Sequence, residues 1–211
     1  MTGDGAERLD GEWPVAFDGV VESVVTTRGP NERWNVAALG LHAPGGGTGG
    51  DDPDAGPVTA TTWGRTRTRR NFERRGRGVV QFVTDPRDFV DAALAVREED
   101  DPVLDGAAAW VRVAAERRGS ETTGGTERVR WALAPGEGAV RERRVPTIDR
   151  GFNAVIEATV AASRLDVPAY ETATLLDRLD HLADVVASCG GPAVREAFER
   201  VDEYAGWRER R

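Results

Sequence analysis

The stretch from Val58 to Val83, VTATTWGRTRTRRNFERRGRGVVQFV, places an arginine-rich segment between two apolar runs. The runs at 58–63 and 78–83 have the composition of β-strands. The segment between them is positively charged, although the formal net charge of the chain is −8; it reads Gly64-Arg65-Thr66-Arg67-Thr68-Arg69-Arg70-Asn71. The stretch therefore predicts two strands of a β-rich unit, joined by residues suited to an anionic partner.

Further strands are expected on both sides of this stretch. The β-branched runs between Phe17 and Gly40 are separated by Arg28-Gly29-Pro30-Asn31, which has the composition of a turn and predicts a β-hairpin. Residues 110–116 and 128–133 form a second expected pair, with apolar residues alternating along 129–133. About six strands are expected in all. Asp85-Pro86 predicts the start of a short helix between them.

After Asp149 the apolar period changes from two residues to about 3.6. Three apolar helical faces follow, and they are separated by Pro168 and by Gly190-Gly191-Pro192. The predicted fold class is therefore α+β, with a β-rich unit of about six strands and short helices at residues 1–147 and a three-helix domain at residues 148–211. The Gly- and Pro-rich residues 43–57 predict a surface loop.

Composition points to the cellular setting rather than to a function. All 28 basic residues are arginine, and carboxylates outnumber them. This balance is typical of a protein that stays hydrated in high salt, although a GC-rich genome also favours arginine. No apolar run approaches the roughly 20 residues of a membrane helix, and the acidic N-terminus differs from a signal peptide. We expect a halophilic, cytoplasmic protein without a membrane partner, with Cys189 as a small core residue.

The arginine-rich segment contains the donors that a phosphate dianion requires. Guanidinium forks, hydroxyl groups, a carboxamide and backbone N–H groups all bind phosphate oxygens. Thr66, Arg67, Thr68 and Asn71 supply them within six residues. One alternative is an exposed strand end whose arginines pair with the surplus carboxylates. Nucleic-acid binding is a weaker alternative, because the chain is acidic overall.

The order of these motifs resembles the archaeal family called domain of unknown function 447. The resemblance rests on Asn35-Val36-Ala37-Ala38-Leu39-Gly40, on Gly64 with Thr66-Arg67-Thr68 and Asn71, and on the run from Val79 to Pro86. It extends to residues 152–164. The family combines a split barrel of the flavin-reductase and pyridoxamine-phosphate-oxidase type with a small helical domain.

The resemblance implies a binding site for FMN at a homodimer interface. It implies that the phosphate is held by Thr66, Arg67, Thr68 and Asn71. It also implies that the ring or the ribityl chain is lined by Asn35, Val36, Ala37 and Ala38, with Gln81 in place of a family Asn. Arg69 stands where the family usually has an aromatic residue, and Asp149-Arg150 replaces an Asn-Arg pair.

The sequence indicates no catalytic residue and no metal site. His42 and His181 have no neighbouring Cys or His at ligand spacing. A flavoprotein does not need such residues, because the flavin itself carries the electrons. Two hypotheses follow. The first is an FMN-dependent oxidoreductase that acts on an unknown small molecule, and the second is a non-catalytic split-barrel module that binds a ligand without redox turnover.

Overall fold

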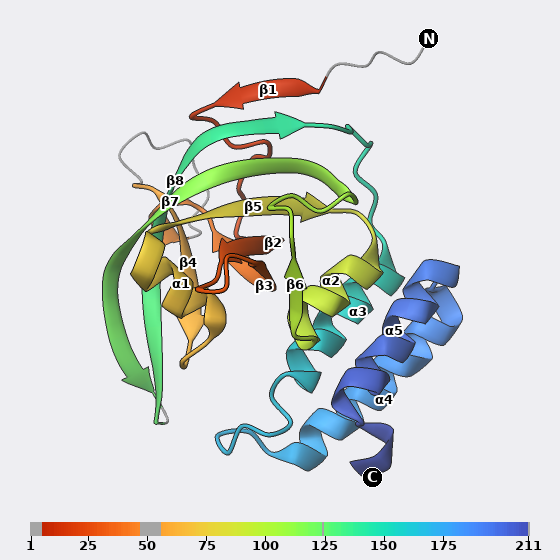
Figure 1. Ribbon diagram of the computed structural model, residues 1–211. Helices are drawn as coiled ribbons and strands as arrows, with labels where there is room; N and C mark the ends of the chain where they lie inside the picture. Colours follow the sequence, from red (N-terminus) through yellow and green to blue (C-terminus); the bar gives the residue numbers. More distant parts are fainter. Residues whose placement is uncertain (1–5, 47–55, 124, 211) are drawn as a thin grey trace. The chain divides into compact units, whose positions relative to one another are not determined.

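The computed structural model describes residues 6–46, 56–123 and 125–210. Contacts between residues divide the chain into two compact units, one formed by residues 1–84 and 98–143 and the other by residues 85–97 and 144–211. The first unit is a β-barrel and the second is helical (Figure 1). Most of the predicted surface loop, residues 47–55, lies outside the described residues.

The barrel unit contains strands and one α-helix, in the chain order β1 (Glu7–Asp10), β2 (Val20–Arg28), β3 (Trp34–His42), β4 (Val58–Trp63), α1 (Arg67–Arg75), β5 (Arg77–Val83), β6 (Arg97–Glu99), β7 (Ala107–Thr123) and β8 (Thr126–Val140). The sheet order β8-β4-β3-β2-β5-β7 is closed by pairing between β7 and β8. The β-barrel of about six strands that the resemblance implied is thus confirmed, and it is closed and antiparallel.

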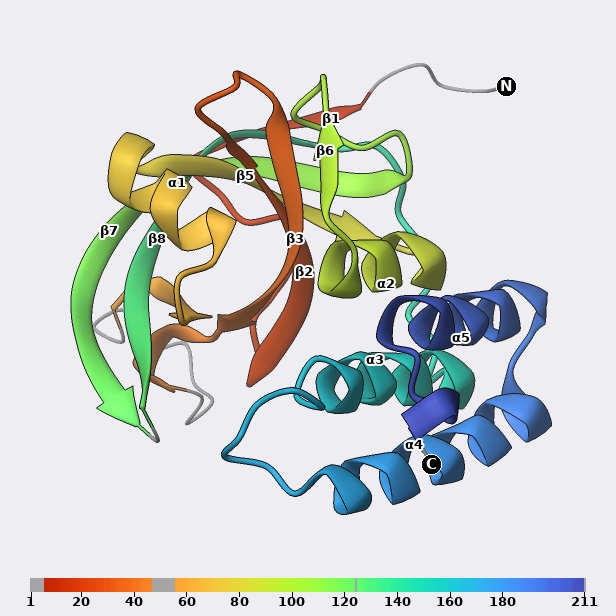
Figure 2. The ribbon, with the colours of Figure 1, turned by 60° about the horizontal axis from the view of Figure 1, so that its bottom comes forward.

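Three features of the barrel differ from the sequence expectation or extend it. Strand β1 pairs with the end of β8, and the short β6 pairs with β3, as Figure 2 shows. The hairpin of β7 and β8 is also much longer than the two predicted runs, and it forms the long curved pair in Figure 1. Gly138 permits this pairing, because a Cβ there would lie 2.6 Å from the Trp110 carbonyl oxygen.

The barrel interior is filled by side chains that alternate along the strands. Val129, Trp131 and Leu133 of β8 are all buried, as the period of two predicted. The Trp131 indole N–H donates to Thr62 Oγ1 at 2.9 Å, so its polar atom is satisfied inside the core. Phe72 of α1 belongs to the same cluster, and its ring centroid lies 5.2 Å from that of Trp131.

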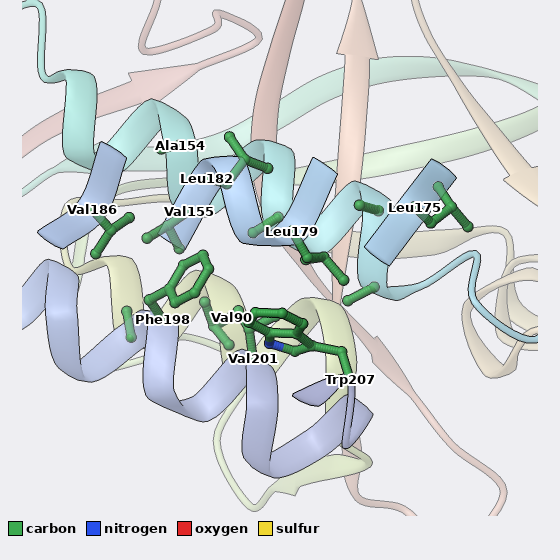
Figure 3. Close-up of a cluster of buried hydrophobic side chains, with 14 of the residues drawn as sticks. Val90, Ala154, Val155, Leu175, Leu179, Leu182, Val186, Phe198, Val201 and Trp207 are labelled. Carbon is green, nitrogen blue, oxygen red and sulfur yellow. The ribbon is translucent and has the colours of Figure 1, made fainter. Parts of the chain in front are cut away.

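The helical unit is formed by α2 (Pro86–Leu94), α3 (Arg150–Ala162), α4 (Thr172–Cys189) and α5 (Pro192–Ala205). Asp85 and Asp149 cap α2 and α3, and each carboxylate accepts a backbone N–H of the first turn. The buried faces of the helices meet around Phe198, Val201 and Trp207 (Figure 3). No helix in the described part of the chain is long and apolar enough to cross a membrane.

Two sequence expectations about this unit need correction. The predicted division at 147/148 assigned the helix at 86–94 to the barrel, whereas its contacts group it with the C-terminal helices. The reason is that Val90 is fully buried in the helical core (Figure 3). Cys189 is not a core residue: it is exposed at the end of α4.

Candidate functional site

The arginine-rich segment folds as helix α1, with signals at both ends. Thr66 is the N-cap residue, and its Oγ1 accepts the backbone N–H of Arg69 at 3.2 Å. The helix ends at Gly76, whose φ of 59° lies in the left-handed region, and the Gly76 N–H donates to the Phe72 carbonyl oxygen. The alternative of an exposed strand end is therefore wrong.

One face of α1 is fixed against the barrel by apolar and polar contacts. Phe72 is 1% exposed, and the neighbouring Thr68 and Asn71 are also buried. Asn71 Nδ2 donates to the carbonyl oxygen and to Oγ1 of Thr27 on β2, at 3.3 and 3.1 Å. Thr68 Oγ1 accepts from Asn35 Nδ2 at 3.4 Å. These hydrogen bonds to β2 and β3 fix the rotation of α1 about its axis. They therefore also fix the side of the helix from which its arginines extend.

Beside this helix the barrel unit has a pocket of about 300 Å³. Its walls come from α1, from the turn between β2 and β3, from the start of β3 and from β6. The residues that line it are Gly29, Pro30, Asn31, Asn35, Arg67, Arg70, Asn71, Arg74 and Glu98. Three arginines and one glutamate give this lining a formal charge of +2, in a chain whose net charge is −8.

The three arginines of the pocket differ in how their guanidinium groups are engaged. Arg67 Nη1 donates to Glu98 Oε1 at 3.1 Å. Arg74 Nη1 makes a longer hydrogen bond of 3.4 Å to Asn71 Oδ1. Arg70 is exposed, and among the described residues its guanidinium forms no hydrogen bond or ion pair. Arg70 therefore has all its donors available for a ligand.

Arg69, in contrast, is a structural residue. Its guanidinium donates to Glu73, to Glu127 and to the Gly64 carbonyl oxygen at 2.9, 2.8 and 3.2 Å. The same hydrogen bond from Arg69 lowers the pKa of the Glu127 carboxyl below its usual value. Pairing with surplus carboxylates, which was the alternative interpretation, therefore applies to Arg69 and also to Arg67, which pairs with Glu98.

The structure brings Asn35, Arg67 and Asn71 together in the pocket, and these are three of the residues that the sequence selected. Thr66 and Thr68 do not line it: Thr66 caps the helix, and Thr68 is buried beneath it. Their hydroxyl groups support the geometry of the site, and the direct phosphate contacts that the resemblance implied stay a prediction.

Four consecutive residues of β3 cannot all line one cavity, because successive side chains of a strand point to opposite faces. Asn35 and Ala37 pair with Thr27 and Val25 on the barrel-facing side, and Ala37 packs against the barrel core. Val36 and Ala38 are on the opposite face. Of residues 35–38, only Asn35 lines the pocket.

Gln81 is inside the structure and does not line the pocket. It is fully buried. Its amide nitrogen Nε2 donates to the Pro102 carbonyl oxygen at 3.0 Å, and its Oε1 accepts the Leu104 N–H at 2.7 Å. Gln81 therefore fixes the segment at 102–104 on the outside of β5. Its side chain satisfies buried backbone groups, and its assignment to the cofactor site stays a prediction.

The residues that sequence reasoning missed are Asn31, Arg70, Arg74 and Glu98. Arg70 and Arg74 follow Arg67 by three and seven positions, which places all three on one side of a helix. That spacing would have selected them, had the Thr66 cap and Gly76 been recognised as the ends of a helix. No local signal indicated Glu98, because it reaches the pocket through the pairing of β6 with β3.

A second and larger cavity of about 470 Å³ lies on the outer side of β4, β7 and β8. It contains none of the residues that the sequence selected. Two arginines line it, but Arg128 is already paired with Glu121 and lies over the Trp63 ring. By size alone this cavity would be the better candidate for a ligand site. The number of available cationic donors instead favours the pocket beside α1 as the site for an anion.

The closed six-strand antiparallel barrel with an attached helical unit places the chain in the split-barrel class. Residues 21–142 match the family model described as the N-terminal domain of "protein of unknown function (DUF447)", and residues 149–203 match the model described as "protein of unknown function (DUF447)". Because the two matches cover most of the sequence, the chain belongs to this family.

A solved structure of the same family agrees with the fold. An FMN-bound protein of the same family from Methanosarcina mazei is 24% identical, with a TM-score of 0.71 over 89% of this chain and 95% of that one. The flavin reductase of styrene monooxygenase from Pseudomonas putida S12 is 15% identical, with a TM-score of 0.36 over 61% of this chain and 83% of that one. No curated protein matches the chain.

Proposed function

We propose that this protein binds FMN and that the pocket beside α1 holds its phosphate. The observation that carries the proposal is the lining itself, in which Arg67, Arg70 and Arg74 project from one side of a helix against a single carboxylate. Its formal charge of +2 matches a phosphate monoester, which carries about −1.5 to −2 at neutral pH. The carboxamides of Asn31, Asn35 and Asn71 add neutral hydrogen-bonding groups.

The first turn of α1 gives an independent reason to expect an anion. Helices favour acidic residues at their N-terminal end, where the backbone dipole is positive. α1 has none in its first turn and has Arg67 there instead. A bound phosphate near this end would offset the repulsion between the arginines and the helix dipole.

The family supports FMN as the phosphorylated ligand, because the related Methanosarcina mazei protein is FMN-bound. The pocket of about 300 Å³ is suited to the phosphate end of such a ligand rather than to the whole molecule. We therefore propose a homodimer in which a second copy of the chain completes the walls around the flavin ring.

When bound, the flavin would supply the redox chemistry, since its ring accepts and donates hydride or single electrons. The residues of this chain would bind and orient it. An oxidoreductase that acts on an unknown small molecule is one form of the proposal, and a binding module without turnover is the other. Reduction of the bound flavin by NADH or NADPH, followed as bleaching of its visible absorbance, separates the two.

The direct test is titration of the purified protein with FMN in concentrated KCl, followed by quenching of flavin fluorescence. We expect saturable quenching by FMN and much weaker binding of riboflavin, which lacks the phosphate. The difference should amount to several kcal/mol, because a phosphate forms several charge-assisted hydrogen bonds of about 1.5–3 kcal/mol each. Equal binding of the two flavins would contradict a phosphate site, and no binding of either would contradict the proposed function.

Gln81→Ala should lower stability without changing FMN affinity. The substitution removes buried volume and leaves the Leu104 N–H without its acceptor, so we expect a loss of about 2–4 kcal/mol in the free energy of unfolding. Urea denaturation and FMN titration of the same samples measure both quantities. Gln81→Met, which keeps the volume, is the matched control and should lose less. Weakened FMN binding with unchanged stability would instead show that Gln81 takes part in binding the flavin.

A further inference from the structure

Glu98 is the single carboxylate among the described residues that line the pocket, and it contacts two of the other lining residues. Its Oε1 accepts from Arg67 Nη1 at 3.1 Å, and its Oε2 accepts from Asn31 Nδ2 at 3.0 Å. The two carboxylate oxygens are therefore placed between a guanidinium and a carboxamide, which are the kinds of donor that bind phosphate oxygens.

The position of Glu98 is fixed through its backbone as well. Arg33 Nη2 donates to the Glu98 carbonyl oxygen at 3.1 Å, and Arg33 also pairs with Asp100. The Glu98 side chain is 27% exposed, compared with 88% for Asp100. Glu98 belongs to β6, which pairs with β3, the strand that supplies Asn35. The carboxylate is thus held at the pocket by the fold and is not a freely moving surface group.

We propose that Glu98 is an internal competitor of the ligand phosphate for Arg67, an inference that rests on the proposed function. A phosphate that binds Arg67 must share the guanidinium with the Glu98 carboxylate, which already accepts from Nη1 at 3.1 Å, so the two anions repel each other and compete for one cation. A ligand without a phosphate meets no such competition. Glu98 therefore limits how tightly phosphorylated ligands bind, and it leaves the binding of ligands without a phosphate unchanged.

The size of the expected effect follows from the exposure of the pair. Arg67 and Glu98 are 45% and 27% exposed, and ion pairs of this kind are weak enough to be broken at a cost of less than about tenfold in an equilibrium constant. Glu98→Gln keeps the shape of the side chain and an acceptor for Asn31, but it removes the charge. We expect it to tighten FMN binding by about two- to fivefold, and to leave riboflavin binding unchanged.

The experiment is titration of the full chain with FMN and with riboflavin, at one fixed salt concentration, in five forms: wild type, Glu98→Gln, Arg67→Ala, the double variant and Asp105→Asn. Asp105 is an exposed carboxylate of the barrel unit that does not line the pocket, so Asp105→Asn controls for net charge. Competition requires the gain from Glu98→Gln to shrink when Arg67 is absent, because the two residues act on each other.

Each result has a defined meaning. A tighter FMN complex in Glu98→Gln, with no gain in Asp105→Asn and a reduced gain in the Arg67→Ala background, supports competition. Weaker FMN binding in Glu98→Gln would show that Glu98 positions Arg67 for the ligand and would overturn the proposal. An equal gain in FMN affinity with and without Arg67 would show that Glu98 acts only by general charge repulsion. That result would also overturn the proposal. Failure of every form to bind FMN would remove the proposed function, and the proposal with it.

Discussion

Phe72→Ala is expected to destabilise the barrel unit by about 3–5 kcal/mol, the usual cost of truncating a buried Phe. Phe72 is 1% exposed and contacts Trp131 in the barrel core. It is also the apolar side chain that attaches α1 to the barrel, so its removal should loosen the helix that presents Arg67 and Arg70. We therefore expect a loss of FMN affinity along with the loss of stability.

Hydrogen exchange of peptides from residues 58–83 measures this effect locally, without assuming that both units unfold together. Phe72→Leu, which keeps most of the apolar volume, is the matched control and should cost less than half as much. Full protection of α1 in Phe72→Ala would show that its hydrogen bonds from Asn71 to Thr27 are sufficient to hold the helix.

Arg70→Ala is expected to weaken FMN binding by about 1.5–3 kcal/mol, which corresponds to a factor of about 10–100, without lowering stability. Arg70 is exposed at the pocket, and within the described residues it forms no ion pair that the substitution would remove. Its guanidinium is therefore free to contact the phosphate, whereas the Arg67 guanidinium is shared with Glu98.

The matched control is Arg65→Ala, because Arg65 is exposed five positions earlier in the chain and does not line the pocket. Both substitutions remove one positive charge, so a difference between them isolates direct contact from the general electrostatic field. Riboflavin affinity should not distinguish the two variants. If Arg70→Ala and Arg65→Ala bind FMN equally well, the phosphate does not contact Arg70.

Much of the barrel could be predicted because its strands have a clear local pattern. The turn at 28–31 and the alternation of Val129, Trp131 and Leu133 are properties of short segments, and both are present in the structure. Helix α1 was missed for the opposite reason. Phe72 is its one buried apolar residue, so no apolar period of 3.6 exists to detect, and only the capping residues Thr66 and Gly76 mark its ends.

The site was harder to predict than the fold, because its residues come together through long-range contacts. Arg67 and Asn71 could be identified from the sequence because they belong to one short motif within α1. Glu98 reaches the pocket through pairing between strands, and Gln81 is buried by the segment at 102–104, neither of which a local sequence pattern specifies. The same types of polar residue hydrogen-bond to backbone groups and bind ligands, so only the structure distinguishes the two roles.

The membership of α2 in the helical unit has a consequence for how the chain can be divided. That unit is assembled from two separate segments, residues 85–97 and 144–211, with the whole β7–β8 hairpin between them in sequence. A fragment truncated at residue 147 would lack the partners of Val90 and would expose an apolar helix face to aggregation. Ribosomal synthesis must likewise complete both segments before this core can close.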